Sequence, residues 1–269
     1  MASVSLPVIP NLRHIVTDAD KHTDTGFRAF TNINLPAKPG DNWGMEVEMP
    51  QWVSEVHNRY SGRCFLFGTG PSLVPQLPLI SRMKEEFTIT CNRMRQWKEM
   101  PFTPWMHCVT EPGPLIQWGK RINPTYDFPG AQNHVCCIWF QVTAPGWLWL
   151  PKAPDDVQGR WQGTFGMGDR LPPIPTFWAS PLTIAQLALW MGFTSLYLLG
   201  VDTTQTGQAW DPVYGRTQQP RNIRSILECA ERMCRDVKRA GRTLLDCTPG
   251  GRMNVEGAVP YAELSDVLA

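Results

Sequence analysis

Residues 68–72, Gly-Thr-Gly-Pro-Ser, have the types and spacing of a turn that handles a phosphate or a nucleotide. They follow an apolar run, where glycines let the backbone approach a ligand closely and amide groups at the beginning of a helix attract anions. No Gly-Lys-Ser/Thr follows, which excludes a Walker loop, and the third glycine of the dinucleotide fingerprint is missing. An ordinary tight strand-to-helix turn is the alternative. We predict that Gly68, Thr69, Gly70, Pro71 and Ser72 bind a nucleotide.

Other polar residues stand where later apolar runs end. Asn92 follows the run 87–91, Glu111 lies just beyond the run 105–109, and Asp202 closes the segment Gly200-Val201-Asp202. Ligands of parallel sheets bind outside the carboxyl ends of the strands, so these residues are expected beside the turn. Ser180 begins a helical pattern, and its hydroxyl suits either a phosphate or a helix cap.

Strands and helices alternate in the sequence that must position these residues. Ser180, Pro181 and Gly192 give the helix at 180–191 an N-cap, a first-turn proline and a stop. The alternation predicts an α/β fold, a Rossmann-like, doubly wound and mainly parallel sheet. The predicted strands are 63–67, 87–91, 105–109, 135–140, 195–201 and 243–246, and the clearest helices are 180–191 and 220–240.

The chain divides by composition into an irregular N-terminal extension, residues 1–61, and a Rossmann-like domain with the nucleotide-binding turn, residues 62–269. The extension is rich in Pro, Asn, Asp and Thr, and we expect it to wrap on the body through Trp43 and Trp52. Residues 142–176 carry many Gly, Pro and Trp residues. Long loops in compact domains are usually functional or mobile, so this insertion is predicted to be a lid, with a surface excursion as the alternative.

Composition bounds the class of protein. The 269 residues are 42% hydrophobic and 18% charged with a net charge of +1, which indicates a globular chain without a global field for nucleic acid or anionic membranes. Eight cysteines without a Cys-x-x-Cys pair favour free buried thiols over a zinc site. There is no secretion signal and no apolar stretch of membrane-spanning length, so a cytoplasmic protein without a membrane partner is expected.

The segments GTGPSL, TCN and LWMGFTSLYLLGVD, in that order, resemble two related families. One is the Cst-type bacterial sialyltransferases, which use a cytidine nucleotide sugar. The other is the MptE-like family, which includes archaeal 6-hydroxymethyl-dihydropterin diphosphokinases and is more similar at the ending LLDCTPGGRMNVEGAVPYAELSDVL. Similar proteins occur in bacteriophages, and a phage-encoded protein would be located in the host cytoplasm. The resemblance covers residues 62–268 and implies a nucleotide pocket lined by Gly68, Gly70, Ser72, Asn92, Ser180 and Asp202.

The sequence departs from the sialyltransferase pattern at the residues that would carry out the reaction. That family carries a Tyr and a His after the Gly-x-Asp strand, and the corresponding segment here, 211–217, holds Tyr214 but has Arg216 in place of the His. An arginine stays protonated and cannot act as a base, although it can stabilise phosphate charge. Glu111 stands where that family has an Asn.

The resemblance implies a transferase with a nucleotide donor and no tightly bound cofactor. The first choice is glycosyl transfer from a nucleotide sugar, with Tyr214 and Arg216 stabilising the departing phosphate and Asp202, Glu111 or Asp211 as the base. One alternative is an MptE-like diphosphokinase that uses ATP with magnesium held by Asp202 and Glu111, with Arg216 or Arg252 neutralising phosphates. Another is a non-catalytic nucleotide- or glycan-binding module.

The sequence leaves the acceptor open between a glycan, a modified DNA base and a pterin-like molecule. It also leaves open whether the chain forms a homo-oligomer. The helix at 220–240 interleaves six basic residues with acids, which predicts a solvated face. For a DNA acceptor, this helix would be the first surface to test.

Overall fold

The structure, a computed structural model, describes residues 27–28, 49–110, 128–138, 141–142, 147–151, 165–169, 171, 174, 179–203, 207–209 and 223–269. Its strands are β1 (Phe27–Arg28), β2 (Arg63–Phe67), β3 (Phe87–Cys91), β4 (Met106–Val109), β5 (Asn133–Ile138), β6 (Gln141–Val142), β7 (Trp147–Pro151), β8 (Ser195–Leu199) and β9 (Thr243–Asp246). The α-helices are α1 (Gln51–Glu55), α2 (Leu77–Ile80), α4 (Ser180–Met191), α5 (Ile223–Arg239), α6 (Arg252–Val255) and α7 (Leu264–Val267). Short 3₁₀ turns are η2 (Pro71–Leu73), η3 (Ser81–Met83) and η4 (Asn92–Gln96).

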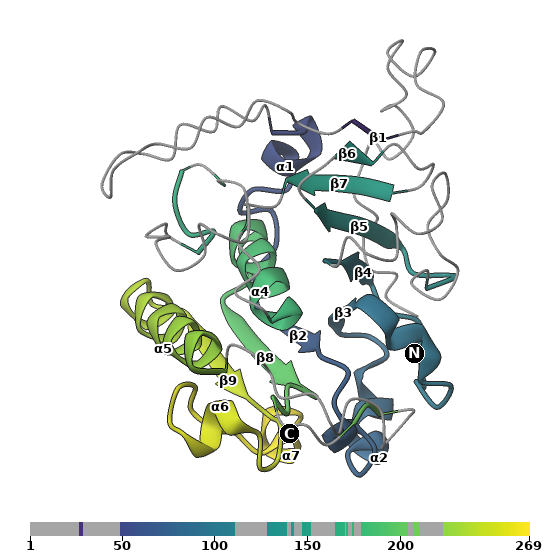
Figure 1. Cartoon of the computed structure of the whole chain (residues 1–269), viewed down its shortest axis with the longest axis vertical. Helices are drawn as coiled ribbons and strands as arrows, with labels where there is room; N and C mark the ends of the chain where they lie inside the picture. Colours follow the sequence, from purple (N-terminus) through teal and green to yellow (C-terminus); the bar gives the residue numbers. More distant parts are fainter. Residues whose placement is uncertain are drawn as a thin grey trace.

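Seven parallel strands form the central sheet, in the order β7-β5-β4-β3-β2-β8-β9 (Figure 1). The chain builds outward from β2 to β7, then returns to place β8 on the other side of β2. The strand order therefore reverses between β2 and β8, which is the point where open α/β sheets bind ligands. The Rossmann-like α/β fold expected from the sequence is confirmed. β1 and β6 pair separately as a two-stranded antiparallel ribbon.

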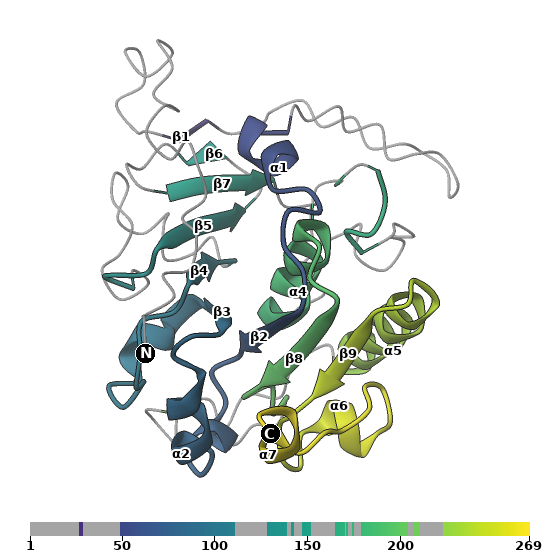
Figure 2. The same ribbon diagram turned by 180° about the vertical axis from the view of Figure 1, so that it is seen from behind.

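Two apolar layers cover the two faces of the sheet. On one face, α4 packs against β2, β3 and β8, and α5 packs against β9. On the other, residues of η2, α2, η3, η4 and α7 pack over Phe65 and Phe67 of β2 and over Leu199 of β8. Figures 1 and 2 show the β2 and β8 arrowheads pointing toward the end of the sheet where α2 and α7 lie.

Helices α4 and α5 have the bounds and burial that their patterns predict, with two differences. Gly192 ends α4 in the left-handed conformation, at φ 105°, as expected of a glycine stop. Ser180 is not the N-cap, because Ala179 takes that place and Ser180 is the first helical residue. In α5 the described helix begins at Ile223, and its exposed face pairs Arg224 with Glu228 and Arg235 with Glu231, as a solvated helix does.

Two regions predicted to be irregular contribute to the body of the domain. Within residues 1–61, α1 buries Trp52 and Val53 in the main core, so part of the predicted extension packs with the domain. Within the predicted lid, 142–176, residues Trp147–Pro151 form β7, the edge of the sheet. That part of the lid prediction is wrong. A lid formed by the rest of the insertion stays a prediction, and Trp43 lies outside the described residues.

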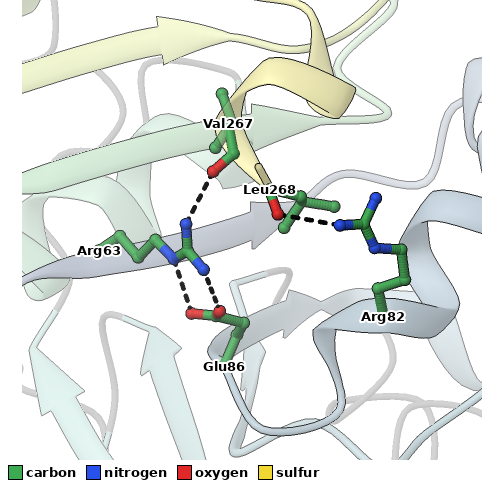
Figure 3. Close-up of polar contacts among 5 residues, drawn as sticks. All are labelled: Arg63, Arg82, Glu86, Val267 and Leu268. Carbon is green, nitrogen blue, oxygen red and sulfur yellow. Dashed lines mark hydrogen bonds and ion pairs between the residues drawn. The ribbon is translucent and has the colours of Figure 1, made fainter.

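The last helix is held against the sheet by two arginines (Figure 3). Arg63, at the beginning of β2, donates from Nη1 to the Val267 carbonyl at 2.7 Å and pairs through Nε with Glu86 at 3.0 Å. Arg82 donates to the Leu268 carbonyl at 3.0 Å. Cations at these carbonyls complement the negative end of α7. This arginine clamp holds α7 in place while its apolar residues pack in one cluster with Phe65 and Phe67 of β2.

Candidate functional site

The two glycine-containing segments singled out in the sequence meet at the reversal point of the sheet. Gly70 donates its amide to the Gly200 carbonyl at 2.8 Å. Ser72 donates its amide to Asp202 Oδ1 at 3.2 Å and its hydroxyl to Oδ2 at 2.8 Å. The ends of β2 and β8 are thus joined by bonds between residues 130 positions apart in the chain. Segments 68–72 and 200–202 together form what we call the switch-point turn.

Gly70 is required at its position because the two backbones approach so closely. Its φ of −71° is open to any residue, so conformational freedom is not the reason. A Cβ on Gly70 would overlap the Asp202 carboxylate and lie 2.7 Å from the Gly200 oxygen. Gly200 itself has a φ of 64°, in the left-handed region. Glycine is therefore needed at position 70 because the two turns contact each other so closely.

The turn differs from the open anion cradle that the sequence suggests. The amides of Gly68, Gly70 and Ser72 are bonded to Leu199, Gly200 and Asp202, respectively. The expected helix after the turn is a three-residue 3₁₀ turn, η2. Within the described part of the chain, the Thr69 amide has no acceptor, while the Thr69 carbonyl accepts the Ala209 amide at 2.8 Å. Thr69 is therefore the residue whose amide and hydroxyl can reach a ligand from this turn.

A second polar cluster joins the ends of β3 and β4 to the first turn of α4. Asn92, at a left-handed φ of 50°, accepts the Thr110 amide at 2.9 Å and donates to Ser180 Oγ at 2.7 Å. The Thr110 hydroxyl also donates to Ser180 Oγ, at 2.7 Å. The Thr110 hydroxyl also lies 3.4 Å from Asn92 Oδ1, so the Ser180 hydroxyl can turn its proton toward Thr110 or toward a ligand. Asn92, predicted to touch the nucleotide, thus orients Ser180, and Thr110, which stands just before Glu111 at the end of the predicted strand 105–109, joins the cluster.

Asp202 is the charged centre of the switch-point turn. Burial raises the pKa of Asp202 above its usual value, while the two hydrogen bonds from Ser72 oppose that rise. The Asp202 carbonyl accepts the Arg252 amide at 3.1 Å, which places the beginning of α6 directly beside it. The Arg252 guanidinium forms an ion pair with Glu256, the C-cap residue of α6.

A buried carboxylate that sequence analysis did not select lies behind the turn. Asp246, the last residue of β9, is 0% exposed. It accepts the Thr248 amide at 2.9 Å and the Asn254 side-chain amide at 2.8 Å. Thr248 Oγ1 in turn accepts the Val201 amide at 3.1 Å. The sequence signal that could have identified Asp246 is its place at the end of an apolar strand, just before a glycine-rich turn.

Asp246 makes stability depend on pH. Burial raises the pKa of Asp246 from 3.8 to about 6, against the lowering effect of its bonds to Thr248 and Asn254; the Asp202 charge raises it further. The folded state therefore holds this proton more tightly than the unfolded state, and its contribution is present below pH 4 and lost as pH rises through 6. Between pH 4 and pH 7 we expect wild type to lose about 2–3 kcal/mol more stability than Asp246→Asn. Urea unfolding of both proteins at the two pH values measures it, and parallel pH profiles would contradict it.

Several predicted site residues lie outside the described residues, namely Glu111, Asp211, Tyr214 and Arg216. Their roles stay predictions. His107, which the sequence places near Thr110, is 0% exposed and shares a 2.9 Å hydrogen bond with Thr90 inside the sheet. All eight cysteines are free, as expected, and among the described residues no group of three His, Cys, Asp or Glu side chains could hold a metal ion. No described helix is long and apolar enough to cross a membrane.

Comparisons with known proteins give one structural likeness. No protein-family model matches the chain, and no curated protein matches its sequence. Among solved structures, the chain is similar to the crystal structure of the sialyltransferase CST-II in complex with a trisaccharide acceptor and CMP. The identity is 13%, the TM-score is 0.43, and the match covers 74% of this chain and 86% of that chain.

Proposed function

We propose that this protein is a transferase that takes a nucleotide donor into the crevice between the carboxyl ends of β2 and β8, and that the reaction is glycosyl transfer from a nucleotide sugar. One observation carries the proposal: two segments 130 residues apart are bonded to each other where the strand order reverses. Parallel α/β sheets bind nucleotides at that point.

The polar groups around the crevice suit different parts of a nucleotide. Thr69 offers an amide and a hydroxyl, and Ser180 offers a hydroxyl proton, so both can donate to phosphate oxygens. Asp202 offers only acceptors, so it suits a ribose or acceptor hydroxyl. A donor phosphate would be repelled by the Asp202 charge without a nearby cation. Arg216 is the cation that the sequence provides for this role, and Arg252 is the described cation at the edge of the turn.

In the proposed reaction, the acceptor hydroxyl oxygen forms the new bond to the anomeric carbon as the bond from that carbon to the phosphate oxygen breaks. The hydroxyl proton passes to a carboxylate, for which Asp202 is our choice because a raised pKa suits a base. Tyr214 and Arg216 would stabilise the nucleotide phosphate that leaves.

A thermal-shift series with CMP, CDP, UDP, GDP and ATP, each with and without magnesium, tests the proposal. We expect a cytidine or uridine nucleotide to raise Tm without added metal, because bound ligand stabilises the folded state. ATP acting only with magnesium would indicate a diphosphokinase instead. No shift with any of the five would overturn the nucleotide pocket.

A matched pair of threonine variants locates the site. Thr69→Val keeps the shape of the side chain and removes its hydroxyl from the crevice, so the affinity for the active nucleotide should fall about tenfold. Thr194→Val removes a hydroxyl that bonds Gly62 at the opposite end of β2 and β8, and it should leave the affinity unchanged. Equal affinities in the two variants would place the ligand elsewhere. Release of the free nucleotide from a nucleotide sugar, followed by chromatography, then separates transfer from binding alone.

A further inference from the structure

The loop between β9 and α6 is hydrogen-bonded to the 200–202 segment of the switch-point turn. Three backbone groups from the end of β8 and the segment after it are bonded to residues 247–252. The Leu198 carbonyl accepts the Cys247 amide at 2.8 Å, the Val201 amide donates to Thr248 Oγ1, and the Asp202 carbonyl accepts the Arg252 amide. The position of Asp202 is therefore set on one side by Ser72 and on the other by residues 247–252.

The shape of that loop depends on one side chain. Asp246 accepts the Thr248 amide with Oδ1 and the Asn254 side chain with Oδ2, and Asn254 also donates to the Thr248 carbonyl at 2.7 Å. Both hydrogen-bond partners of the carboxylate are donors, so the ionised form fits the network and a protonated oxygen would face a donor. Thr248 is 0% exposed, as Asp246 is, so neither can touch a ligand directly.

We propose that Asp246 is a positioning residue for the nucleotide site: through Thr248 and Asn254 it fixes the loop that orients Val201 and Asp202 against the Gly68–Ser72 turn. The inference rests on the proposed function. A role in stability alone does not account for a carboxylate here, because burial opposes its ionised form at neutral pH. The negative charge instead keeps the Thr248 amide and the Asn254 side chain turned inward and leaves the Thr248 oxygen free to accept from Val201.

Few charged groups lie near Asp246, so its titration can be distinguished from that of its neighbours. Asp202 is the carboxylate that raises its pKa through the local charge. Cys247 and Tyr261 also face it, and the pKa of each is raised to about 12, so both are neutral between pH 5 and 8. Glu263 faces Cys247 and Tyr261 from the beginning of α7.

The experiment compares wild type with Asp246→Asn, Thr248→Val and Thr248→Ser, using the nucleotide that gives the largest shift in Tm. Arg63→Met is the control, because it removes the Arg63 bonds to Glu86 and Val267 at the amino end of β2 and should lower stability without altering a residue of the switch-point turn. At pH 7.5 we expect Asp246→Asn and Thr248→Val to bind about tenfold more weakly, whereas Thr248→Ser and Arg63→Met bind as wild type does.

The pH dependence of nucleotide affinity is a second measurement, which a purely structural role of Asp246 would not change. The ratio of the Kd of Asp246→Asn to that of wild type should fall toward one as pH falls from 7.5 to 5, because wild-type Asp246 then becomes protonated. The ratio cancels any protonation of the nucleotide itself. A ratio that is constant with pH would overturn the proposal.

Amide hydrogen exchange in the ligand-free proteins separates this inference from the proposed function. Asp246→Asn and Thr248→Val should exchange the Val201 and Arg252 amides at least tenfold faster than Arg63→Met does. Unchanged exchange at Val201 would overturn the positioning role even if nucleotides bind. Faster exchange with unaltered affinity would reduce Asp246 to a structural residue. Wild type that binds none of the five nucleotides would overturn the proposed function, and the positioning role with it.

Discussion

Replacing Gly70 by alanine is expected to lower the free energy of unfolding by about 3 kcal/mol or more and to abolish the nucleotide-dependent rise in Tm. The added Cβ overlaps the Asp202 carboxylate and crowds the Gly200 carbonyl, and overpacking of this kind costs about 1–3 kcal/mol. Relief requires Asp202 to release Ser72, which forfeits two hydrogen bonds to a charged group, each worth about 1.5–3 kcal/mol. Urea unfolding and the thermal-shift series measure the two effects.

Two further variants separate close contact from a general effect of losing a glycine. Gly62 has a φ of 79° and no atom within 4 Å of an added Cβ, so Gly62→Ala should show only the backbone cost of about 1–2 kcal/mol and retain binding. In Gly70→Ala/Asp202→Ala the main overlap is removed, so the double variant should be less destabilised than the sum of the single variants. Strict additivity, or wild-type binding by Gly70→Ala, would contradict the account.

The sequence identified the fold because the buried strands of a parallel sheet are short apolar runs with clear ends. All six predicted strands have described bounds within two residues of the prediction, as at 87–91 and 243–246. The largest shift is in β5, whose described part runs from Asn133 to Ile138 against the predicted 135–140. β7 was missed because Trp147–Pro151 is flanked by Pro and Gly, which are typical of loops.

The contact between residues 68–72 and 200–202 was predictable, because each segment directly follows a buried strand. Gly70 and Asp202 stand at the ends of apolar runs, and neighbouring parallel strands bring those ends together. Roles that depend on hydrogen-bond direction could not be predicted. Asn92, with a left-handed backbone, bonds Ser180 and Thr110, and Asp246 bonds the Thr248 amide and the Asn254 side chain.

Trp52→Ala is expected to destabilise the protein by about 3–5 kcal/mol, the usual cost of emptying a buried tryptophan site. Trp52 is 1% exposed and lies in the main core, although it belongs to the segment predicted to be an irregular extension. Its indole N–H donates to the Trp149 carbonyl at 2.9 Å, which satisfies a backbone acceptor on the edge strand β7. Trp190 of α4 donates to the Val53 carbonyl at 2.6 Å, so α1 is bonded to both the sheet and a helix.

A comparison with Trp52→Phe separates the loss of stability into a part due to packing and a part due to hydrogen bonding. Phenylalanine keeps most of the apolar contact but leaves the Trp149 carbonyl without its donor, so we expect a loss of about 1–3 kcal/mol. Chemical denaturation measures both variants, with nucleotide affinity as the second readout. Because α1 lies far from the carboxyl ends of β2 and β8, affinity in the folded fraction should stay at the wild-type value (Figure 1). A stability loss under 1 kcal/mol for Trp52→Ala would show that α1 is an appendage, and the domain would then begin at β2, as its sequence pattern alone predicts.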